Sequence, residues 1–509
     1  MILKKELEPR EYQKTIAENA SKENTLVVLP TGMGKTLISL LVAVNRLDKY
    51  PSKVMILSPT RPLSAQHQKT FEQFTHIPKE EIILLTGKIK PEDRTVLYKK
   101  AQVIIATPQT IENDLEKGRI NLKDFSFLVF DEAHRGVKEY SYSYVARKYR
   151  MQAEHPLILA LTASPGGTQE KIQDICDNLF IKQVEIRDEN SVDVEKYIQQ
   201  VEKENVYVEL PEEFKKIKTL LEEVLNDDLY WLKEKHYTFT YKPTKGMLIA
   251  LQNRVSASFT RGSKNYGAFW AILRVAGAIK LEHALGLLET QGIRFLYEFL
   301  QKLESSNKKT DTRIVKDPRF REAMKLTHDL YSKNIEHPKM QKTIDTIKDF
   351  LKEKPNAKII LFANFRNTVD RIHNLLVENG IGSEILIGQT MKEGKGLSQK
   401  QQIEVLERFK EGEFPVLLGT QIIEEGIDVP SIDYAIFYEP VASEIRMIQR
   451  RGRVGRQSIG KVIFMITKDT RDEAYYYASL RKESKMKGVV SSLQKKGVKK
   501  KKENLMDWV

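Results

Sequence analysis

A short apolar run followed by a phosphate-binding loop constrains the fold of this chain more than any other feature. Leu26 to Leu29 is typical of a buried strand, and the loop Pro30-Thr31-Gly32-Met33-Gly34-Lys35-Thr36 follows it directly. Its glycines let the backbone turn its N–H groups toward phosphate oxygens. Leu29 stands where the usual pattern has a glycine, so the motif is a variant. We predict a nucleotide triphosphate site formed by Thr31, Gly32, Met33, Gly34, Lys35 and Thr36.

Within this loop two side chains have the chemistry that a metal–nucleotide complex requires. The Lys35 ammonium can reach the β- and γ-phosphates, and the Thr36 hydroxyl can ligate magnesium. The apolar helical stretch that begins at Leu37 adds the positive end of its dipole. ATP and Mg²⁺ are therefore expected together at this loop.

A pair of adjacent acids follows a second apolar run, Phe127 to Phe130. Asp131 is predicted to hold the magnesium, directly or through water, and Glu132 to orient or deprotonate an attacking water. The alternative is a polar strand end that leads into a loop. We expect the two loops at the ends of neighbouring parallel strands. His134 either connects this site to the second half of the chain or satisfies a loop carbonyl.

An arginine cluster lies far downstream, in the run from Gln449 to Arg456. Arg453 and Arg456 are three positions apart and share one face of a helix or turn. Phosphoryl transfer spreads charge over the γ-phosphate, and an arginine placed there accelerates it by about 10³–10⁵. Such clusters also bind polyanions generically. With the other two motifs present, we predict that Gln449, Arg453 and Arg456 act on the nucleotide, together with Lys35, Asp131 and Glu132.

Apolar runs and helical stretches alternate in two parts of the chain, which predicts an α/β protein with two doubly wound parallel-sheet lobes. Residues 1–204 are predicted as lobe 1, 205–338 as a helical insertion, 339–482 as lobe 2 and 483–509 as a basic tail or linker. Within the insertion, Ser305–Thr312 is expected to be a polar loop. Strands are predicted at Thr25–Leu29, Val54–Ser58, Ile82–Leu85, Val103–Ala106, Phe127–Phe130, Leu157–Leu161, Lys358–Phe362, Ser383–Ile387, Val416–Gly419, Tyr434–Phe437 and Lys461–Ile466.

Charge and composition narrow the class of protein. The 509 residues carry 83 Lys and Arg against 69 Asp and Glu, a formal net charge of +14 that favours a polyanionic partner such as nucleic acid. The single cysteine, Cys176, excludes an internal disulfide and cysteine-built metal clusters, and is expected to fill apolar space. No apolar run reaches membrane-spanning length, so no membrane partner is expected. We expect a cytoplasmic protein, associated with the nucleoid in a prokaryote, and a Lys- and Glu-rich composition that leans toward a thermophile.

The ordered motifs resemble those of superfamily 2 helicases, over about residues 10 to 456. The phosphate loop resembles motif I, Asp131–His134 motif II (the DEAH-box position), Thr162-Ala163-Ser164 motif III and the arginine cluster motif VI. The helical insertion and the Arg-Gly-Arg-Val-Gly-Arg ending resemble the archaeal Hef and Fanconi-anaemia M type. This resemblance implies two RecA-like lobes and ATP as fuel. In that family an excision-repair nuclease domain follows the helicase, so a C-terminal nuclease domain or partner reached through the basic tail is an expected associate.

The resemblance also implies roles for residues that spacing alone does not assign. Arg10 and Gln13 would read the adenine, and Gly426 and Asp428 would lie near the ribose or phosphates. His134, Thr162 and Ser164 would couple the nucleotide site to the nucleic-acid track. Residues of both lobes would contact one nucleic-acid strand: Thr60, Arg61, Thr86, Gly87, Thr107, Arg366 and Thr420. Threonine and glycine at strand ends also cap helices or form turns, which is the alternative for these positions.

Together these features predict an ATP-dependent DNA helicase or translocase that acts on branched or forked DNA in fork repair. Two alternatives stay open: an ATPase or RNA helicase driven by duplex RNA, and a non-catalytic nucleic-acid-binding scaffold. Basic and aromatic residues of the insertion, among them Lys245, Arg254 and Trp270, either grip nucleic acid or form a solvated face over a helical core.

Overall fold

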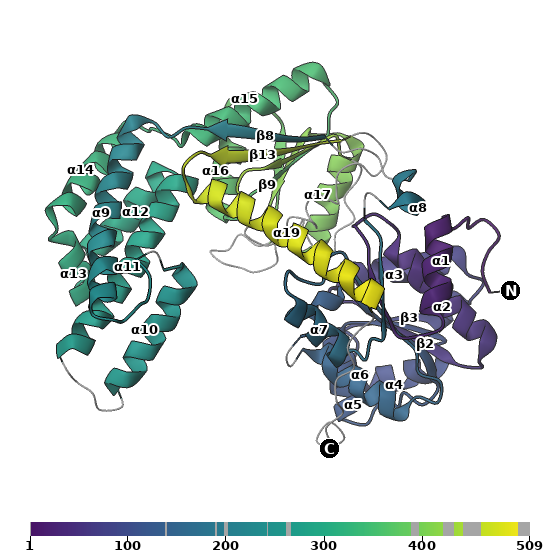
Figure 1. The fold of residues 1–509 in the computed structure, drawn as a ribbon. Helices are drawn as coiled ribbons and strands as arrows, with labels where there is room; N and C mark the ends of the chain where they lie inside the picture. The colour runs from purple at the N-terminus through teal and green to yellow at the C-terminus, as the bar shows by residue number, and fades with distance from the viewer. Residues whose placement is uncertain are drawn as a thin grey trace.

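The computed structural model describes residues 2–137, 140–188, 191–197, 202–241, 243–260, 266–387, 397–420, 432–440 and 460–496. Two sheet-containing lobes and a separate helical bundle make up this part of the chain (Figure 1). The two parallel-sheet lobes with a helical region between them confirm the predicted fold class.

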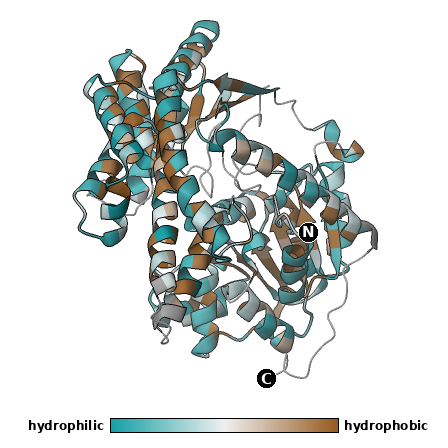
Figure 2. Ribbon diagram, turned by 60° about the vertical axis from the view of Figure 1, so that its left-hand side comes forward, coloured by the Kyte–Doolittle hydropathy of each residue, from teal (hydrophilic) through white to brown (hydrophobic). Residues whose placement is uncertain are grey.

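Lobe 1 is a seven-stranded sheet in the order β3-β4-β2-β5-β6-β1-β7, and its strand pairs are parallel. Alternate residues serve its two faces: Leu26 and Val28 pack into one hydrophobic cluster, and Val27 and Leu29 into the other. Hydrophobic strands lie between helices with hydrophilic outer faces (Figure 2). The strands are β1 Thr25–Val28, β2 Lys53–Leu57, β3 Ile82–Leu85, β4 Val103–Ala106, β5 Phe125–Asp131, β6 Ile158–Thr162 and β7 Gln183–Ile186.

The helices of lobe 1 lie mostly between successive strands along the chain, while the first precedes β1 and the last follows β7. They are α1 Glu11–Ala20, α2 Lys35–Lys49, α3 Arg61–Phe74, α4 Pro91–Lys100, α5 Pro108–Glu116, α6 Ser141–Gln152, α7 Gln169–Asn178 and α8 Val192–Glu195, with short 3₁₀ turns η1 Lys79–Glu81 and η2 Ala133–Arg135. Cys176 lies in α7 and is 1% exposed, as expected of an apolar filler. Burial raises the pKa of its thiol to about 12.

Lobe 2 is a six-stranded sheet in the order β10-β11-β9-β12-β13-β8, also with parallel pairs. Helices α15 Pro338–Glu353, α16 Arg366–Glu378 and α17 Gln399–Glu411 belong to this lobe. Its strands are β8 Glu202–Val208, β9 Ile359–Phe362, β10 Ser383–Leu386, β11 Val416–Gly419, β12 Tyr434–Phe437 and β13 Lys461–Thr467.

Strand β8 alters the predicted division of the chain. The boundary expected at residue 204 falls inside it, and β8 pairs with β13 along its whole length, from Glu202 opposite Lys461 to Val208 opposite Thr467. The second sheet therefore takes its edge strand from sequence that precedes the helical region. The chain enters lobe 2, leaves it for the helical bundle, and then returns.

The helical region is a bundle whose core is formed by apolar faces of its longest helices, α9 and α11, with α12 and α14. The prediction of a polar loop at Ser305–Thr312 is wrong for the second half of that segment, because α13 begins at Lys309. Bounds of the bundle helices are α9 Glu212–Glu234, α10 Lys245–Thr260, α11 Tyr266–Thr290, α12 Ile293–Glu304, α13 Lys309–Val315 and α14 Pro318–Ser332.

The last described helix, α19 Arg471–Lys496, corrects the prediction of a basic tail from residue 483. It leaves lobe 2 and ends against lobe 1 (Figure 1). Met486, Val490 and Leu493 lie one to two turns apart on one face and are buried in a hydrophobic cluster of lobe 1. Residues 497–509 lie outside the described residues. Among the helices that are described, none combines the length and apolarity needed to span a bilayer.

Candidate nucleotide and nucleic-acid site

The phosphate loop joins β1 to α2, and both of its glycines adopt conformations that other residues avoid. Gly32 has φ +84° and Gly34 has φ +73°. A Cβ on Gly34 would stand 2.3 Å from the side-chain nitrogen of Gln13. The loop thus turns sharply after the carboxyl end of β1 and lies against α1.

Polar groups of the loop fit a bound triphosphate. The Lys35 ammonium donates to the carbonyls of Leu29, at 3.0 Å, and Pro30, at 3.4 Å. These are contacts within its own loop, which an anion of higher charge can replace. The Thr31 hydroxyl is buried and has no hydrogen-bond partner among the described residues. Backbone turn, ammonium and hydroxyl together match the donor set that phosphates require.

Helix α1 supports the loop from the side predicted to read adenine. Tyr12 donates its hydroxyl to the Met33 carbonyl at 2.8 Å, and the Gln13 side-chain nitrogen donates to the same oxygen at 3.3 Å. The Arg10 backbone N–H donates to the Gln13 side-chain oxygen at 2.9 Å. Burial raises the pKa of Tyr12, so its hydroxyl stays a donor. The Arg10 guanidinium carbon lies 5.0 Å from the centre of the Tyr197 ring. Tyr197 was not among the residues predicted for this site from the sequence.

Asp131 ends β5 and Glu132 follows it, but this strand is not the direct neighbour of β1. Strand β6 lies between them in the sheet, which corrects the expectation of neighbouring strands. Asp131 is 6% exposed, and its Oδ1 accepts from the Glu132 N–H at 3.0 Å. Glu132 has φ +52°, an uncommon left-handed conformation for a residue with a side chain. At this residue the chain leaves β5 and turns into η2.

A tyrosine behind the acids fixes the strand end. Tyr142 is fully buried and donates its hydroxyl to the carbonyls of Asp131, at 2.6 Å, and Leu57, at 3.2 Å. Burial raises the pKa of this hydroxyl well above its usual value. The ends of β5 and β2 are thereby tied together.

The three residues expected to couple the sites lie in one chain of contacts. His134 Nδ1 lies 3.2 Å from Glu132 Oε2 and 3.3 Å from the Thr162 hydroxyl oxygen. The Ser164 N–H donates to the same Thr162 oxygen at 3.1 Å. The Ser164 hydroxyl donates to the sulfur of Met486, in α19, at 2.9 Å. This chain runs from the second acid to a helix that originates in lobe 2.

The residues predicted to hold magnesium supply few ligands of their own. No group of three or more His, Cys, Asp or Glu side chains within the described ranges is arranged to hold a metal ion. Asp131 and Thr36 fit Mg²⁺ in kind, because it prefers hard oxygen ligands and is commonly held by one or two protein groups, substrate phosphates and water. The donor set therefore fits a metal that arrives with a nucleotide.

The predicted nucleic-acid contacts of lobe 1 gather on one edge. Thr60 and Arg61 follow β2, Thr86 and Gly87 follow β3, and Thr107 follows β4. These strands are adjacent and parallel, so the segments meet at the same carboxyl edge. Thr60 precedes α3 without capping it through its side chain, and its buried hydroxyl has no hydrogen-bond partner within the described part of the chain. Thr107 instead bonds the Thr110 hydroxyl at 2.9 Å.

Lobe 2 is only partly described at its predicted contacts. Arg366 begins α16 after β9, and Thr420 follows β11, the adjacent strand. These two residues therefore share a carboxyl edge. The other predicted residues of lobe 2 lie outside the described residues: Gly426, Asp428, Gln449, Arg453 and Arg456.

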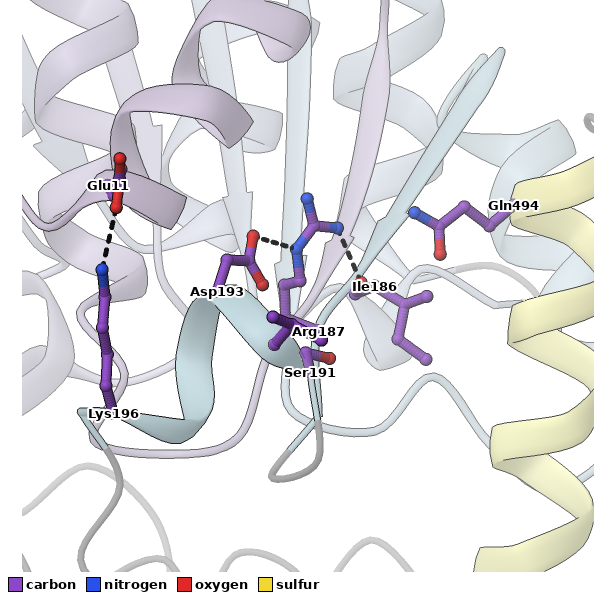
Figure 3. A pocket seen from close by; sticks show the side chains of 8 residues that line it. Glu11, Ile186, Arg187, Ser191, Asp193, Lys196 and Gln494 are labelled. Carbon is purple, nitrogen blue, oxygen red and sulfur yellow. Dashed lines mark hydrogen bonds and ion pairs between the residues drawn. The ribbon is translucent and has the colours of Figure 1, made fainter.

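An open pocket of about 580 Å³ beside α8 is distinct from the phosphate loop (Figure 3). Its charged side chains are already paired with one another: Lys196 with Glu11 at 2.9 Å, and Arg187 with Asp193 at 2.8 Å. Gln494 of α19 lies across from them. This pocket contains none of the predicted nucleotide-binding residues.

Comparison with known families assigns both sheet-containing lobes. Residues 10–172 match the DEAD/DEAH box helicase family and residues 342–458 match the helicase conserved C-terminal domain. Residues 213–346 match the family described as "Putative ATP-dependent RNA helicase, helical bundle". The protein class is that of superfamily 2 helicases.

Relatives narrow this class. The chain is similar to the crystal structure of the Pyrococcus furiosus Hef helicase domain, with a TM-score of 0.76 and 43% identity, and covers all of that chain with 94% of its own. It belongs to the helicases of the archaeal Hef and Fanconi-anaemia M type, as the motifs suggested. The predicted enzyme class, an ATP-dependent helicase, is confirmed.

Longer curated proteins resemble the chain over most of its length. It is 45% identical, over 97% of its residues, to the "Putative ATP-dependent RNA helicase MJ1505" of Methanocaldococcus jannaschii. It is 33% identical over 92% to the "ATP-dependent DNA helicase MPH1" of Pyricularia oryzae, and 32% over 90% to the "ATP-dependent DNA helicase fml1" of Schizosaccharomyces pombe. The chain spans 62%, 44% and 57% of these relatives, respectively.

Proposed function

We propose that this chain is the motor of an ATP-dependent DNA helicase or translocase that acts on branched or forked DNA. One observation carries the proposal. A single carboxyl edge of the lobe 1 sheet holds the phosphate loop, the two acids, and the hydroxyls proposed to contact a nucleic-acid strand. A change at the nucleotide can therefore reach the strand contacts through one rigid sheet. We assign the parts as lobe 1, helical insertion, lobe 2 and a C-terminal basic segment.

In the proposed mechanism each lobe 1 residue has one task at the nucleotide. Lys35 leaves its loop carbonyls to bind the β- and γ-phosphates, and Gln13 and Arg10 hold the base. Thr36 and Asp131 would hold Mg²⁺, which when bound neutralises phosphate charge. Glu132 accepts the proton of the attacking water. His134 then conveys the change in charge at Glu132 to Thr162.

Lobe 2 completes the proposed site. Arg453 and Arg456 would bring positive charge to the γ-phosphate, with Arg456 as the arginine finger, and Gln449 would offer its neutral amide to the nucleotide. Gly426 and Asp428 would lie near the ribose or phosphates. The arginines come from the other lobe, so closure of the lobes and hydrolysis depend on each other. Reopening after hydrolysis changes the grip on the strand and moves the protein along it.

Branched DNA requires a second contact surface, and we propose it on the helical region. A pocket of about 610 Å³ is lined by Gly267 and by aromatic and basic side chains: Trp231, Lys235, Tyr237, Trp270 and Arg274. Trp231 and Tyr237 stack with their rings 6.0 Å apart, and Phe239 nearby is 90% exposed. Unpaired bases stack on such rings with little sequence preference. Some basic residues of this region are committed elsewhere, since Lys280 pairs with Asp311.

Names of relatives divide between two kinds of nucleic acid. The fungal relatives are named DNA helicases, and the M. jannaschii relative and the helical-bundle family are named for RNA. Those RNA names favour the second candidate function, a duplex-RNA-dependent ATPase. A scaffold with an inert site is disfavoured by the full set of Lys35, Asp131 and Glu132 at one sheet edge.

ATP turnover on a panel of single-stranded, duplex, forked and four-way DNA and duplex RNA tests the proposal. We expect the largest stimulation with forked or four-way DNA. Stimulation by duplex RNA alone would establish the RNA-directed function instead. The wild type is also compared with Lys35→Ala at saturating DNA. If the two proteins turn over ATP at the same rate, the enzyme function is refuted and the non-catalytic scaffold is the function that stays.

Three further assignments belong to the same proposal. We place the protein in the cytoplasm, at the nucleoid of a prokaryotic cell, and propose a thermophilic source from its composition. A nuclease domain or nuclease partner would act with the motor through the C-terminal basic segment. Co-purification of nuclease activity with the full-length protein tests that association.

A further inference from the structure

A histidine outside every motif discussed so far contacts the predicted magnesium ligand. His67 lies in α3 and is 1% exposed. Its Nε2 is 3.0 Å from Asp131 Oδ2, across 64 positions of sequence. A carboxylate only accepts hydrogen bonds, so Nε2 carries the proton and donates it.

This contact completes the restraint of the Asp131 carboxylate. Its Oδ1 accepts from the Glu132 N–H at 3.0 Å, and its Oδ2 accepts from His67. Two donors on opposite oxygens fix the rotation of the carboxylate plane. A remaining lone pair on either oxygen stays available to a metal ion. Asp131 is therefore oriented before any nucleotide binds.

A purely stabilising role explains His67 poorly. Its other nitrogen, Nδ1, is buried and has no hydrogen-bond partner among the residues described. Burying a polar nitrogen without a partner lowers stability, whereas an apolar side chain of similar size would avoid that loss. The imidazole is thus placed for its single contact with Asp131.

Helix α3 also connects the His67–Asp131 contact to the sheet edge that is proposed to bind nucleic acid. Thr60, Ser64 and His67 are spaced along one face, and the Ser64 hydroxyl donates to the Thr60 carbonyl at 3.1 Å. Thr60 and Arg61 at the start of the helix are proposed nucleic-acid contacts. The distance from Thr60 to His67 along a helix is about 10 Å. Nucleic acid that binds at the start of α3 therefore contacts the same helix that holds Asp131, the proposed metal ligand, two turns further along.

We infer that His67 is a positioning residue for Asp131, and that through it α3 transmits strand binding to the magnesium site. This inference rests on the proposed function, because it presumes that Asp131 ligates Mg²⁺. Partners that orient metal ligands commonly change metal affinity or activity by about 10–100-fold when they are removed.

The test measures how much Mg²⁺ is needed for half-maximal binding of a fluorescent, non-hydrolysable ATP analogue. The variants are His67→Ala, His67→Gln and His67→Asn, with Gln66→Ala, an exposed neighbour on α3, as the matched control. A Gln amide nitrogen reproduces the position of Nε2, and an Asn nitrogen that of Nδ1. We expect the Mg²⁺ midpoint to rise about tenfold or more for Ala and Asn, and to stay near wild type for Gln and the control. Circular dichroism checks that each variant is folded.

Saturating forked DNA is then added to the same titration. We expect DNA to lower the Mg²⁺ midpoint of the wild type, and to leave that of His67→Ala unchanged. Folded Ala, Asn and Gln variants that all share the wild-type midpoint would overturn the positioning role. An unchanged wild-type midpoint with DNA would overturn the transmission. If the wild type binds the analogue equally well without Mg²⁺, the proposed function itself fails at this site.

Discussion

The Ser164 hydroxyl donates a hydrogen bond to the sulfur of Met486 at 2.9 Å, which joins the loop after β6 in lobe 1 to a helix that begins in lobe 2. Both residues are buried, at 1% and 2% exposure. The same loop reaches Glu132 through Thr162 and His134. Helix α19 therefore brings a side chain from the segment after β13 of lobe 2 into contact with the loop that follows β6 of lobe 1.

The first prediction concerns this docking of α19. Val490→Lys would bury an unpaired ammonium in the lobe 1 cluster, so the helix should detach. A cost of about 1.4 kcal/mol raises the open population about tenfold. Trypsin cleavage within α19 should accelerate by at least about that factor. Ser492→Lys, on the exposed face of the same helix, is the control. Equal cleavage rates in the two variants would mean that α19 does not dock in solution.

A second prediction tests the fit of the phosphate loop against α1. Gly34→Ala would place a Cβ 2.3 Å from the Gln13 side-chain nitrogen, in a backbone of positive φ, and should abolish ATP binding. Gly118→Ala shares the positive φ but has open space around the new methyl group. It should lower stability by about 1 kcal/mol and leave nucleotide affinity unchanged. Equilibrium binding of a fluorescent ATP analogue separates the two, and similar affinities would refute the close approach.

A third prediction is that ATP affinity and turnover distinguish the roles of Lys35 and Glu132. Glu132→Gln should retain ATP affinity and lose about 10²–10⁴-fold in turnover, because the proton acceptor is gone while Asp131 and Lys35 remain. Lys35→Ala should lose both affinity and turnover, the latter about 100-fold or more. Single-turnover hydrolysis combined with binding measures this split. Loss of binding in Glu132→Gln would show that its role is misassigned.

Stability should fall in mild acid because of His337. This residue is fully buried, its Nε2 lies 3.0 Å from the Glu289 carbonyl, and its Nδ1 accepts from the Lys339 N–H at 3.1 Å. Burial, with the nearby Lys339 charge, lowers its pKa to about 3, so it stays neutral when folded. The unfolded chain takes up the proton near pH 6.5, so stability is present above that pH and is lost as pH falls toward 3.

At pH 5.5 the expected loss from this group is about 1.4 kcal/mol relative to neutral pH. His337→Gln keeps a donor and an acceptor but does not titrate. Urea unfolding followed by tryptophan fluorescence at pH 7.5 and 5.5 should show a smaller drop for His337→Gln than for the wild type. Equal drops in both proteins would assign the acid sensitivity to other groups.

Buried strands were predictable from sequence because their signal is local. The runs at β1, β5 and β9 are apolar on both faces, as central parallel strands require. Strand β8 was missed since its run, Glu-Lys-Glu-Asn-Val-Tyr-Val, is largely charged and polar. It lies at a sheet edge, where Lys461 pairs with Glu204 at 2.6 Å, so its order comes from a strand far away in sequence.

Helix α19 and His67 were missed for a related reason. The lysines around Met486 and Val490 are typical of a solvated tail. The apolar residues among them indicate a docked helix only when the lobe 1 surface that buries them is known. His67 is one polar residue on an amphipathic helix, and its partner Asp131 is remote in sequence. The phosphate loop and acids were predictable because their chemistry is encoded within a few consecutive residues.

The central claim, that two lobes close around one nucleotide, is tested most directly by the distance between them. Spin labels at Glu18→Cys in α1 and Val377→Cys in α16 are exposed, while native Cys176 is buried and leaves the labelling specific. With a non-hydrolysable ATP analogue and forked DNA, pulsed dipolar spectroscopy should show a new, narrower distance population. Arg456→Ala should reduce that population. A wild-type distance distribution that is identical with and without saturating, bound nucleotide would contradict the account.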